Sequence, residues 1–145
     1  MNTVSREELL KRYDAVGFFS EGLAEVKKDG VGFHIYHDGT PAYDARYSSV
    51  GPFSEGRAWA WKDGFGYHIC PDGTPAYEAR YDGVGDFSEG RAPARNGADW
   101  FHIYHDGTPA YAARYHIVSP FYEGRARAWK DHVELHIRPD GTRVP

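Results

Sequence analysis

Histidines recur along this sequence at a fixed interval, and they are the first residues that could do chemistry. Four lie 34 residues apart: His34, His68, His102 and His136. Two of these precede a second histidine by three residues, at His37 and His105. Zinc needs three or four convergent ligands, and residues three apart on a strand face opposite sides of the sheet. We therefore predict no metal site and no cofactor, and interpret these four histidines as strand residues that bond to the backbone of a neighbouring repeat.

Four glutamates share the same interval: Glu21, Glu55, Glu89 and Glu123. General acid/base catalysis needs two carboxylates in unlike environments, whereas identical repeats give them like environments. Each glutamate is instead expected to pair with a repeating arginine, because a guanidinium can donate two hydrogen bonds to one carboxylate. The arginines of this set are Arg12, Arg46, Arg80 and Arg114.

The single cysteine, Cys70, stands two residues after His68, so a strand would place thiol and imidazole on one face. Such a neighbour could activate the thiolate as a nucleophile. The corresponding residues of the other repeats are Tyr36, Tyr104 and Arg138, so Cys70 fills a variable position. We predict that the protein has no catalytic residue and is not an enzyme.

Arginine and tryptophan side chains vary from repeat to repeat while their neighbours stay small. Ala58 and Ala60 alternate with Trp59 and Trp61, so the large side chains share the opposite face of a strand. Protein interfaces favour Trp and Arg, although packing between adjacent repeats is an equally good interpretation. The predicted binding residues are Arg57, Trp59, Trp61, Arg91, Arg95, Arg125, Arg127 and Trp129.

These residues are positioned by a repeat of 34 residues, which is a sign of a tandem architecture. We divide the chain into a leader, residues 1–11, and four repeats, residues 12–45, 46–79, 80–113 and 114–145. The second and third repeats share 20 of 34 residues, including Phe53 and Phe87, which belong to a repeated core phenylalanine that also includes Phe19 and Phe121. A capping box at Ser5 and Glu8 predicts a short helix, about residues 6–13, whose stripe of Leu9, Leu10 and Tyr13 covers the first repeat.

Each repeat contains two strand signals and several turn signals. In the second repeat a strand begins at Arg57, the segment Lys62-Asp63-Gly64 links it to a second strand, residues 67–70, and Asp72-Gly73 follows. Asp-Gly indicates a type I′ hairpin, in which both residues have positive φ. The next segment, Thr74-Pro75-Ala76-Tyr77, fits either a short strand or one helical turn; we favour the strand.

The predicted fold is all-β: four antiparallel hairpin or meander repeats in an open array, capped by the helix. The alternative is a small four-bladed propeller, but propeller blades usually have about 40 residues or more. The length of 145 residues allows a real core, and 41% apolar with 26% charged residues argues against disorder. A net charge of −4 argues against a nucleic-acid partner. No apolar segment suggests a signal peptide or a membrane span, so we expect a cytoplasmic location.

Several phrases of this sequence resemble the WG-repeat (KWG-type) family of bacterial tandem β-repeat proteins. They are Phe53-Ser54-Glu55-Gly56-Arg57-Ala58, Gly66-Tyr67-His68-Ile69, Asp72-Gly73-Thr74-Pro75 and Arg80-Tyr81-Asp82. The name-giving Trp-Gly pair is replaced by Val31-Gly32, Phe65-Gly66, Asp99-Trp100 and Val133-Glu134. The resemblance implies a β-rich array used for binding. We predict a binding or scaffolding module for a protein partner; a carbohydrate-binding module is the alternative, and the oligomeric state is left open.

Overall fold

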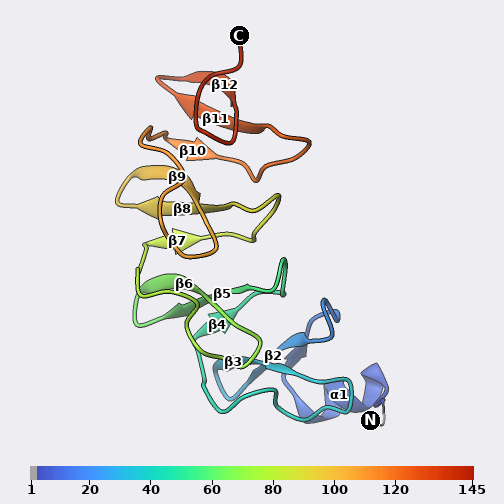
Figure 1. Cartoon of the computed structure of the whole chain (residues 1–145). Helices are drawn as coiled ribbons and strands as arrows, with labels where there is room; N and C mark the ends of the chain where they lie inside the picture. The colour runs from blue at the N-terminus through green and yellow to red at the C-terminus, as the bar shows by residue number, and fades with distance from the viewer. Residues whose placement is uncertain (1–2) are drawn as a thin grey trace.

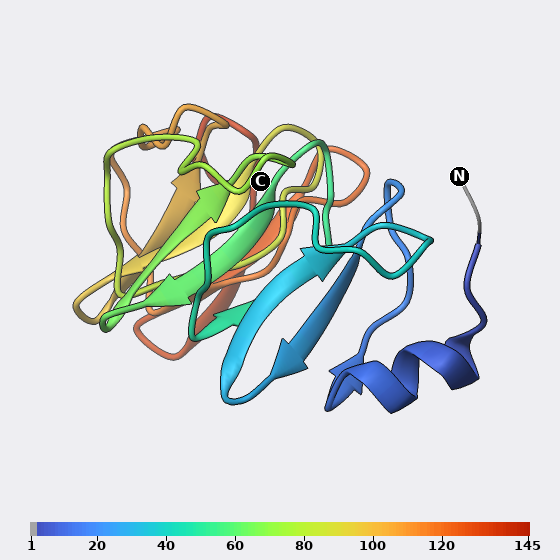
Figure 2. The same cartoon turned by 90° about the horizontal axis from the view of Figure 1, so that it is seen from below.

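The computed structural model describes residues 3–145, and it shows four three-stranded antiparallel sheets that follow one another as an open stack (Figure 1). Helix α1 and strand β12 lie at opposite ends of the stack, and no sheet within these residues closes into a ring. Figure 2 looks along the stack from the end that carries the helix. The open array is therefore confirmed, and the alternative of a propeller is wrong.

Each repeat contributes one strand of two residues and two strands of five residues. Helix α1 is Arg6–Arg12; the strands are β1 (Ala15–Val16), β2 (Ala24–Lys28), β3 (Val31–Ile35), β4 (Ser49–Val50), β5 (Ala58–Lys62), β6 (Phe65–Ile69), β7 (Gly83–Val84), β8 (Ala92–Asn96), β9 (Asp99–Ile103), β10 (Ile117–Val118), β11 (Ala126–Lys130) and β12 (Val133–Ile137). The sequence analysis identified the two longer strands. It missed the short one, because two residues are too few to show alternation.

Two tight turns shape each repeat, and both need a residue other than glycine at positive φ. The long strands of the first repeat are joined at Asp29 (φ 52°) and Gly30 (φ 82°). A second turn, at Glu21 (φ 54°) and Gly22 (φ 83°), is closed by two backbone hydrogen bonds between Ser20 and Leu23, of 2.8 and 3.2 Å. Both pairs have the backbone of the type I′ hairpin turn.

The prediction of a type I′ turn at Asp72-Gly73 and its counterparts is wrong. Gly73 has a φ of 85°, but Asp72 is not in the positive-φ region. The Asp72 carboxylate instead accepts hydrogen bonds from the backbone N–H and the hydroxyl of Thr74, at 3.0 and 2.6 Å. Aspartate favours such local bonds to its own turn, so the loop is longer than a two-residue hairpin.

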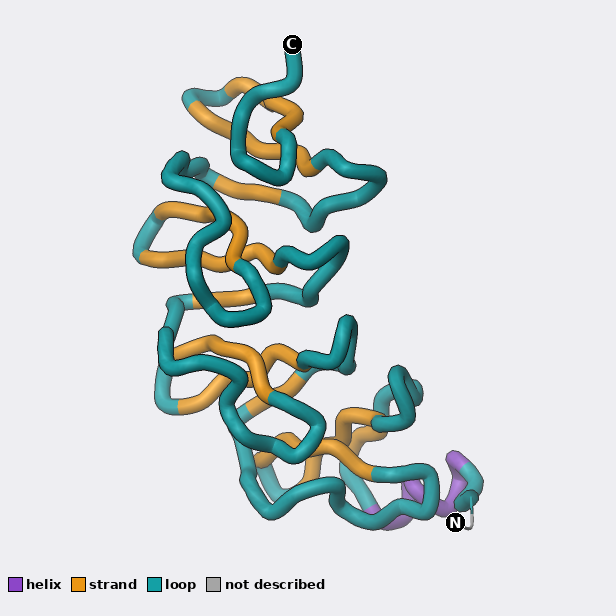
Figure 3. Tube along the Cα trace, in the orientation of Figure 1, coloured by secondary structure: helices purple, strands orange, loops and turns teal. Residues whose placement is uncertain are grey.

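The segment Thr74–Tyr77 forms neither the favoured strand nor a helical turn. One bridge joins Pro75 to Ile69. Proline cannot donate to a ladder, and beyond it the Arg80 guanidinium takes over: it donates to the carbonyls of Tyr77, Glu78 and Ala79, each at 2.9 Å. These carbonyls are therefore satisfied without a partner strand (Figure 3).

A backbone bridge also links each sheet to the next. Gly66 and Tyr81 exchange two hydrogen bonds of 2.7 and 2.9 Å, just before Tyr81 leads into β7. The same exchange joins Gly32 to Tyr47 and Trp100 to Tyr115. The outer edge of β3, β6 and β9 is therefore paired with the following repeat.

The core lies between successive sheets and is built from repeated residues. Phe53, Phe87 and Phe121 are each 1% exposed, whereas Phe19 of the first repeat is only partly buried. The small face of each long strand is also buried, with Ala60, Ala94 and Ala128 fully enclosed. Three of the four repeated phenylalanines are thus confirmed as core residues.

Helix α1 covers the first repeat as predicted, with one error in its apolar stripe. The Ser5 hydroxyl accepts a hydrogen bond from the Glu8 N–H at 3.2 Å, as a helix N-cap does. Leu9 is 1% exposed, but Leu10 is 49% exposed and faces solvent. The first two residues of the predicted leader lie outside the described residues. No helix among the described residues has the length and apolar character needed to cross a membrane.

Candidate binding surface

Trp59 and Trp61 lie on the face of β5 opposite the buried alanines, as the alternation predicted. Trp59 is across from His68 of β6, and Trp61 is across from Gly66. Both indoles are partly buried. Trp59 lies directly over Gly51, in the space that a Cβ there would occupy, and Trp61 is packed over Gly66. Glycines on the neighbouring strands therefore make room for the two rings.

A groove with a volume of about 300 Å³ runs between these indoles and the next repeat. Its lining consists of Ser49, Trp59, Ala60, Trp61, Gly66, Gly83 and Val84. The sequence analysis missed Gly83 and Val84 because they belong to the short strand β7. The tryptophans therefore do face an adjacent repeat, but that repeat leaves space beside them.

Three of the predicted binding arginines are engaged by the protein's own backbone. Arg95 donates to the carbonyls of Gly97 and Asp82, at 2.9 and 3.0 Å. Arg91 donates to the Pro139 carbonyl at 3.3 Å and lies over the Tyr104 ring. Arg57 is partly buried and donates to its neighbour, the Gly56 carbonyl, at 3.0 Å.

The remaining predicted residues gather on the last repeat. Arg125 and Arg127 are exposed, while Trp129 is partly buried. The Arg127 guanidinium lies 5.7 Å from the Trp129 ring centroid and 3.8 Å from a Glu134 carboxylate oxygen. The eight predicted residues thus fall into three places: the groove, the backbone-bound arginines and this group on repeat 4.

The repeated glutamates do not pair with the repeated arginines. The Glu21 carboxylate accepts two hydrogen bonds of 2.8 Å, from the backbone N–H groups of Glu55 and Gly56 in the next repeat. Glu55 in turn accepts from the Gly90 N–H, and Glu89 from those of Glu123 and Gly124. The type I′ turn explains the difference, because its exposed N–H groups point at the carboxylate below.

The repeated arginines stack on aromatic rings instead. The Arg46 guanidinium carbon lies 3.8 Å from the Phe33 ring centroid, and Arg80 lies at the same distance over Tyr67. Arg114 lies 4.0 Å over Phe101. Stacked arginine also keeps its N–H groups in plane for the carbonyls described above. The predicted Arg–Glu pairing is therefore wrong.

Three of the repeated histidines are fully buried and fixed between repeats. His34 Nε2 lies 2.8 Å from the Gly51 carbonyl, and Nδ1 lies 2.6 Å from the Tyr43 hydroxyl. Since a carbonyl only accepts, Nε2 carries the proton and Nδ1 accepts from the tyrosine. Burial lowers the pKa of His34, His68 and His102 to about 4, so the rings are neutral at pH 7. The predicted bond to a neighbouring repeat is confirmed for these three; His136 is exposed.

The catalytic and metal-binding interpretations find no arrangement to support them. Both ring nitrogens of His68 are engaged, by Tyr77 and Gly85, so the ring has no free nitrogen to act as a base for Cys70. Within residues 3–145 no three His, Cys, Asp or Glu residues are placed to hold a metal ion together.

Comparison with protein families places this architecture. The family described as "WG containing repeat" matches residues 2–31, 37–64 and 71–100, more than half of the chain. The chain belongs to this family of tandem β-repeats. A comparison with curated proteins finds no significant match.

Proposed function

We propose that the protein is a non-enzymatic binding module for another protein, and that it holds its partner in the groove beside Trp59 and Trp61. The groove itself carries the proposal. It offers two partly exposed indoles beside Gly66 and Gly83, so a partner side chain can reach both rings. Tryptophan is among the residues that contribute most to protein interfaces.

The setting of the two rings supports the same function. Trp59 is held over Gly51 and Trp61 over Gly66, so neither ring has much rotational freedom to lose on binding. Fixed aromatic anchors bind more tightly than mobile ones, because less conformational entropy is lost. The repeats on both sides of the groove are joined by backbone hydrogen bonds, which keeps its walls at a constant separation.

The test fills the groove without removing the tryptophans. Gly83→Ile adds a side chain at the groove wall, where an added Cβ meets nothing closer than 3.7 Å. The corresponding residue of repeat 4 is Ile117, in strand β10, so the fold accepts isoleucine there. We expect Gly83→Ile to melt like the parent protein and to lose its partner in a capture assay with mass spectrometry.

Two further variants complete the experiment. The double variant Trp59→Ser/Trp61→Ser should also lose the partner, whereas Trp129→Ser, outside the groove, should retain it. Full capture by Gly83→Ile would contradict the proposal. Binding of the parent protein to a glycan array, lost in Gly83→Ile, would replace the protein partner by a carbohydrate.

A further inference from the structure

We propose that the outer face of repeat 4 binds a second ligand: an extended, acidic peptide segment that pairs with strand β12. This site is separate from the groove and does not depend on the proposed function. Its argument starts from what the equivalent face does in the other three repeats.

The outer edge of β12 has free backbone groups where its counterparts are paired. Gly32, Gly66 and Trp100 each exchange two hydrogen bonds with a tyrosine of the following repeat. Glu134 occupies the same position, and within residues 3–145 its N–H and C=O have no such partner. An edge of this kind can accept an added strand, which is a common mode of peptide recognition.

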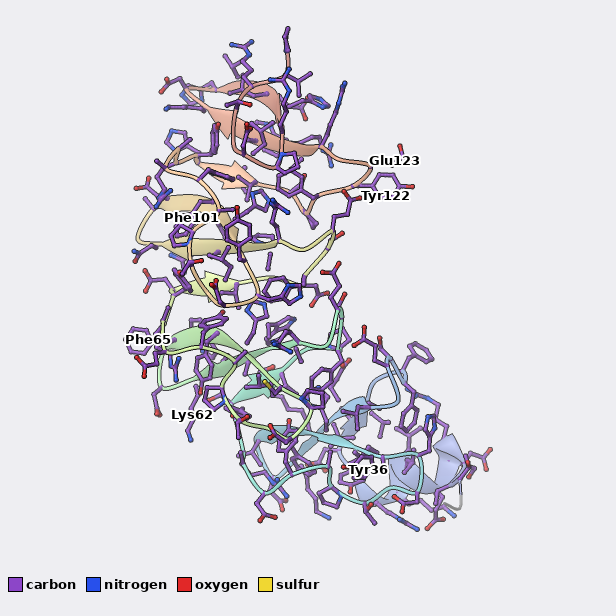
Figure 4. The ribbon with its side chains drawn as sticks, in the orientation of Figure 1. Tyr36, Lys62, Phe65, Phe101, Tyr122 and Glu123 are labelled. Atoms are coloured by element: carbon purple, nitrogen blue, oxygen red, sulfur yellow. The ribbon has the colours of Figure 1, made fainter. Side chains whose placement is uncertain are left out.

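The side chains around this edge are those that were buried or bonded in the other repeats. His136 corresponds to three fully buried histidines, yet it is exposed. Glu123 corresponds to three glutamates that accept N–H groups of the next turn; here it is exposed and projects from its turn beside Tyr122 (Figure 4). The face therefore keeps the groups of a repeat junction without the junction.

Positive charge identifies the kind of peptide. Repeat 4 carries six Lys and Arg against four Asp and Glu, a net charge of +2 in a chain whose total is −4. A hollow of about 250 Å³ is lined by Arg125, Arg143, His136 and the β12 residues Glu134 and Leu135. A second hollow of about 650 Å³ shares Arg125 and His136 and adds Arg127. No hydrogen bond of the Arg125 or Arg143 side chain is formed within the described residues.

Backbone and charge together favour a peptide over other anions. Nucleic acids and polyphosphates satisfy arginines but carry no backbone amides to pair with Glu134. Carboxylates on alternate residues of a strand all face one side, and Arg125, Arg127 and His136 likewise share one face of the β11–β12 hairpin, where Arg127 is opposite His136. Charge-assisted bonds from arginine to carboxylate are among the strongest available.

Calorimetric titration of the chain with a synthetic peptide of alternating Glu and Thr tests the proposal. We expect binding that weakens with added salt and that falls roughly tenfold or more in Arg125→Ala/Arg143→Ala, as for the loss of one charge-assisted contact. Lys11→Ala/Lys27→Ala removes the same charge at the other end of the molecule and should bind like the parent.

Two altered ligands separate the contributions. The same peptide with N-methylated amides keeps its charge but cannot pair as a strand, so its binding should be lost. A Lys/Thr peptide should not bind. Absence of binding by the Glu/Thr peptide, equal binding of the N-methylated peptide, or equal binding of inorganic polyphosphate would each overturn the proposal. Melting curves of all variants establish that they are folded.

Discussion

At the scale of single residues, the structure assigns polar side chains to tasks that differ from the usual ones. His34, His68 and His102 are buried and neutral, held between a tyrosine hydroxyl and a backbone carbonyl of the next repeat. A group whose pKa is lowered on folding makes stability depend on pH. The unfolded chain binds protons near the ordinary histidine value of 6.5, while the folded chain binds them only near 4.

Stability is therefore expected to fall as the pH drops from about 6.5 towards 4, because the unfolded state takes up protons that the folded state refuses. At pH 5 the loss relative to pH 7 is about 1–2 kcal/mol for each buried histidine. Urea unfolding of the parent and of His102→Gln at the two pH values measures it. The variant should lose less stability on acidification than the parent. His116→Gln, at an exposed position, should match the parent, and equal pH dependence in all three proteins would show that burial of His102 does not set it.

At the scale of elements, turns rather than strands determine how the repeats fit together. Gly73, Gly107 and Gly141 each lie against the ring of a tyrosine from the preceding repeat, namely Tyr43, Tyr77 and Tyr111. The adjoining hairpin turns, such as Asp63-Gly64, have equally positive φ but face open space. The two glycine classes thus share a backbone requirement and differ in packing.

Replacing each class by alanine separates the two effects. Gly64→Ala should cost about 1–2 kcal/mol, the strain of a left-handed residue other than glycine. Gly73→Ala adds the displacement of the Tyr43 ring and of its bond to His34, so we expect it to cost about 3 kcal/mol or more. Thermal melts of the two variants compare them directly. Equal losses would mean that the Tyr43 contact adds nothing to the junction.

Much of this fold could be predicted from the sequence, because period-two alternation and Asp-Gly pairs are local signals. The repeat, the long strands, the helix cap and the open array all followed from them. The Glu21 carboxylate was assigned to an arginine because its true partners, two backbone N–H groups 34 and 35 residues away, have no side-chain signature. The groove at Trp59 was missed for a similar reason: its other wall is the two-residue strand β7.

At the scale of the whole molecule, stability is expected to behave as a sum over repeats and junctions, as in other linear arrays. Each junction contains the same carboxylate contact. Glu89 bonds to the turn of repeat 4, whereas Glu123 receives no such N–H group within the described residues. Both glutamates have positive φ, 54° and 51°, so a substitution strains their backbones equally.

Glu89→Ala should therefore destabilise the protein by about 1 kcal/mol or more, the value of hydrogen bonds to a charged group, while Glu123→Ala should change it by only a few tenths of a kcal/mol. Denaturant unfolding measures both. The array would not be coupled through these carboxylates if the two variants lost the same stability.

The junction geometry also bears on how such a gene changes length. Every contact between neighbouring repeats joins residues at fixed offsets, 33 for Ser20 to Phe53, 34 for Glu21 to Glu55 and 17 for His34 to Gly51. An in-frame duplication of one whole repeat recreates each of these contacts at both of its borders. An insertion of any other length inside a repeat leaves amides, carboxylates and imidazoles out of register at once. Heritable variation in this chain is thus expected to come in steps of 34 codons, wherever within a repeat the duplication begins.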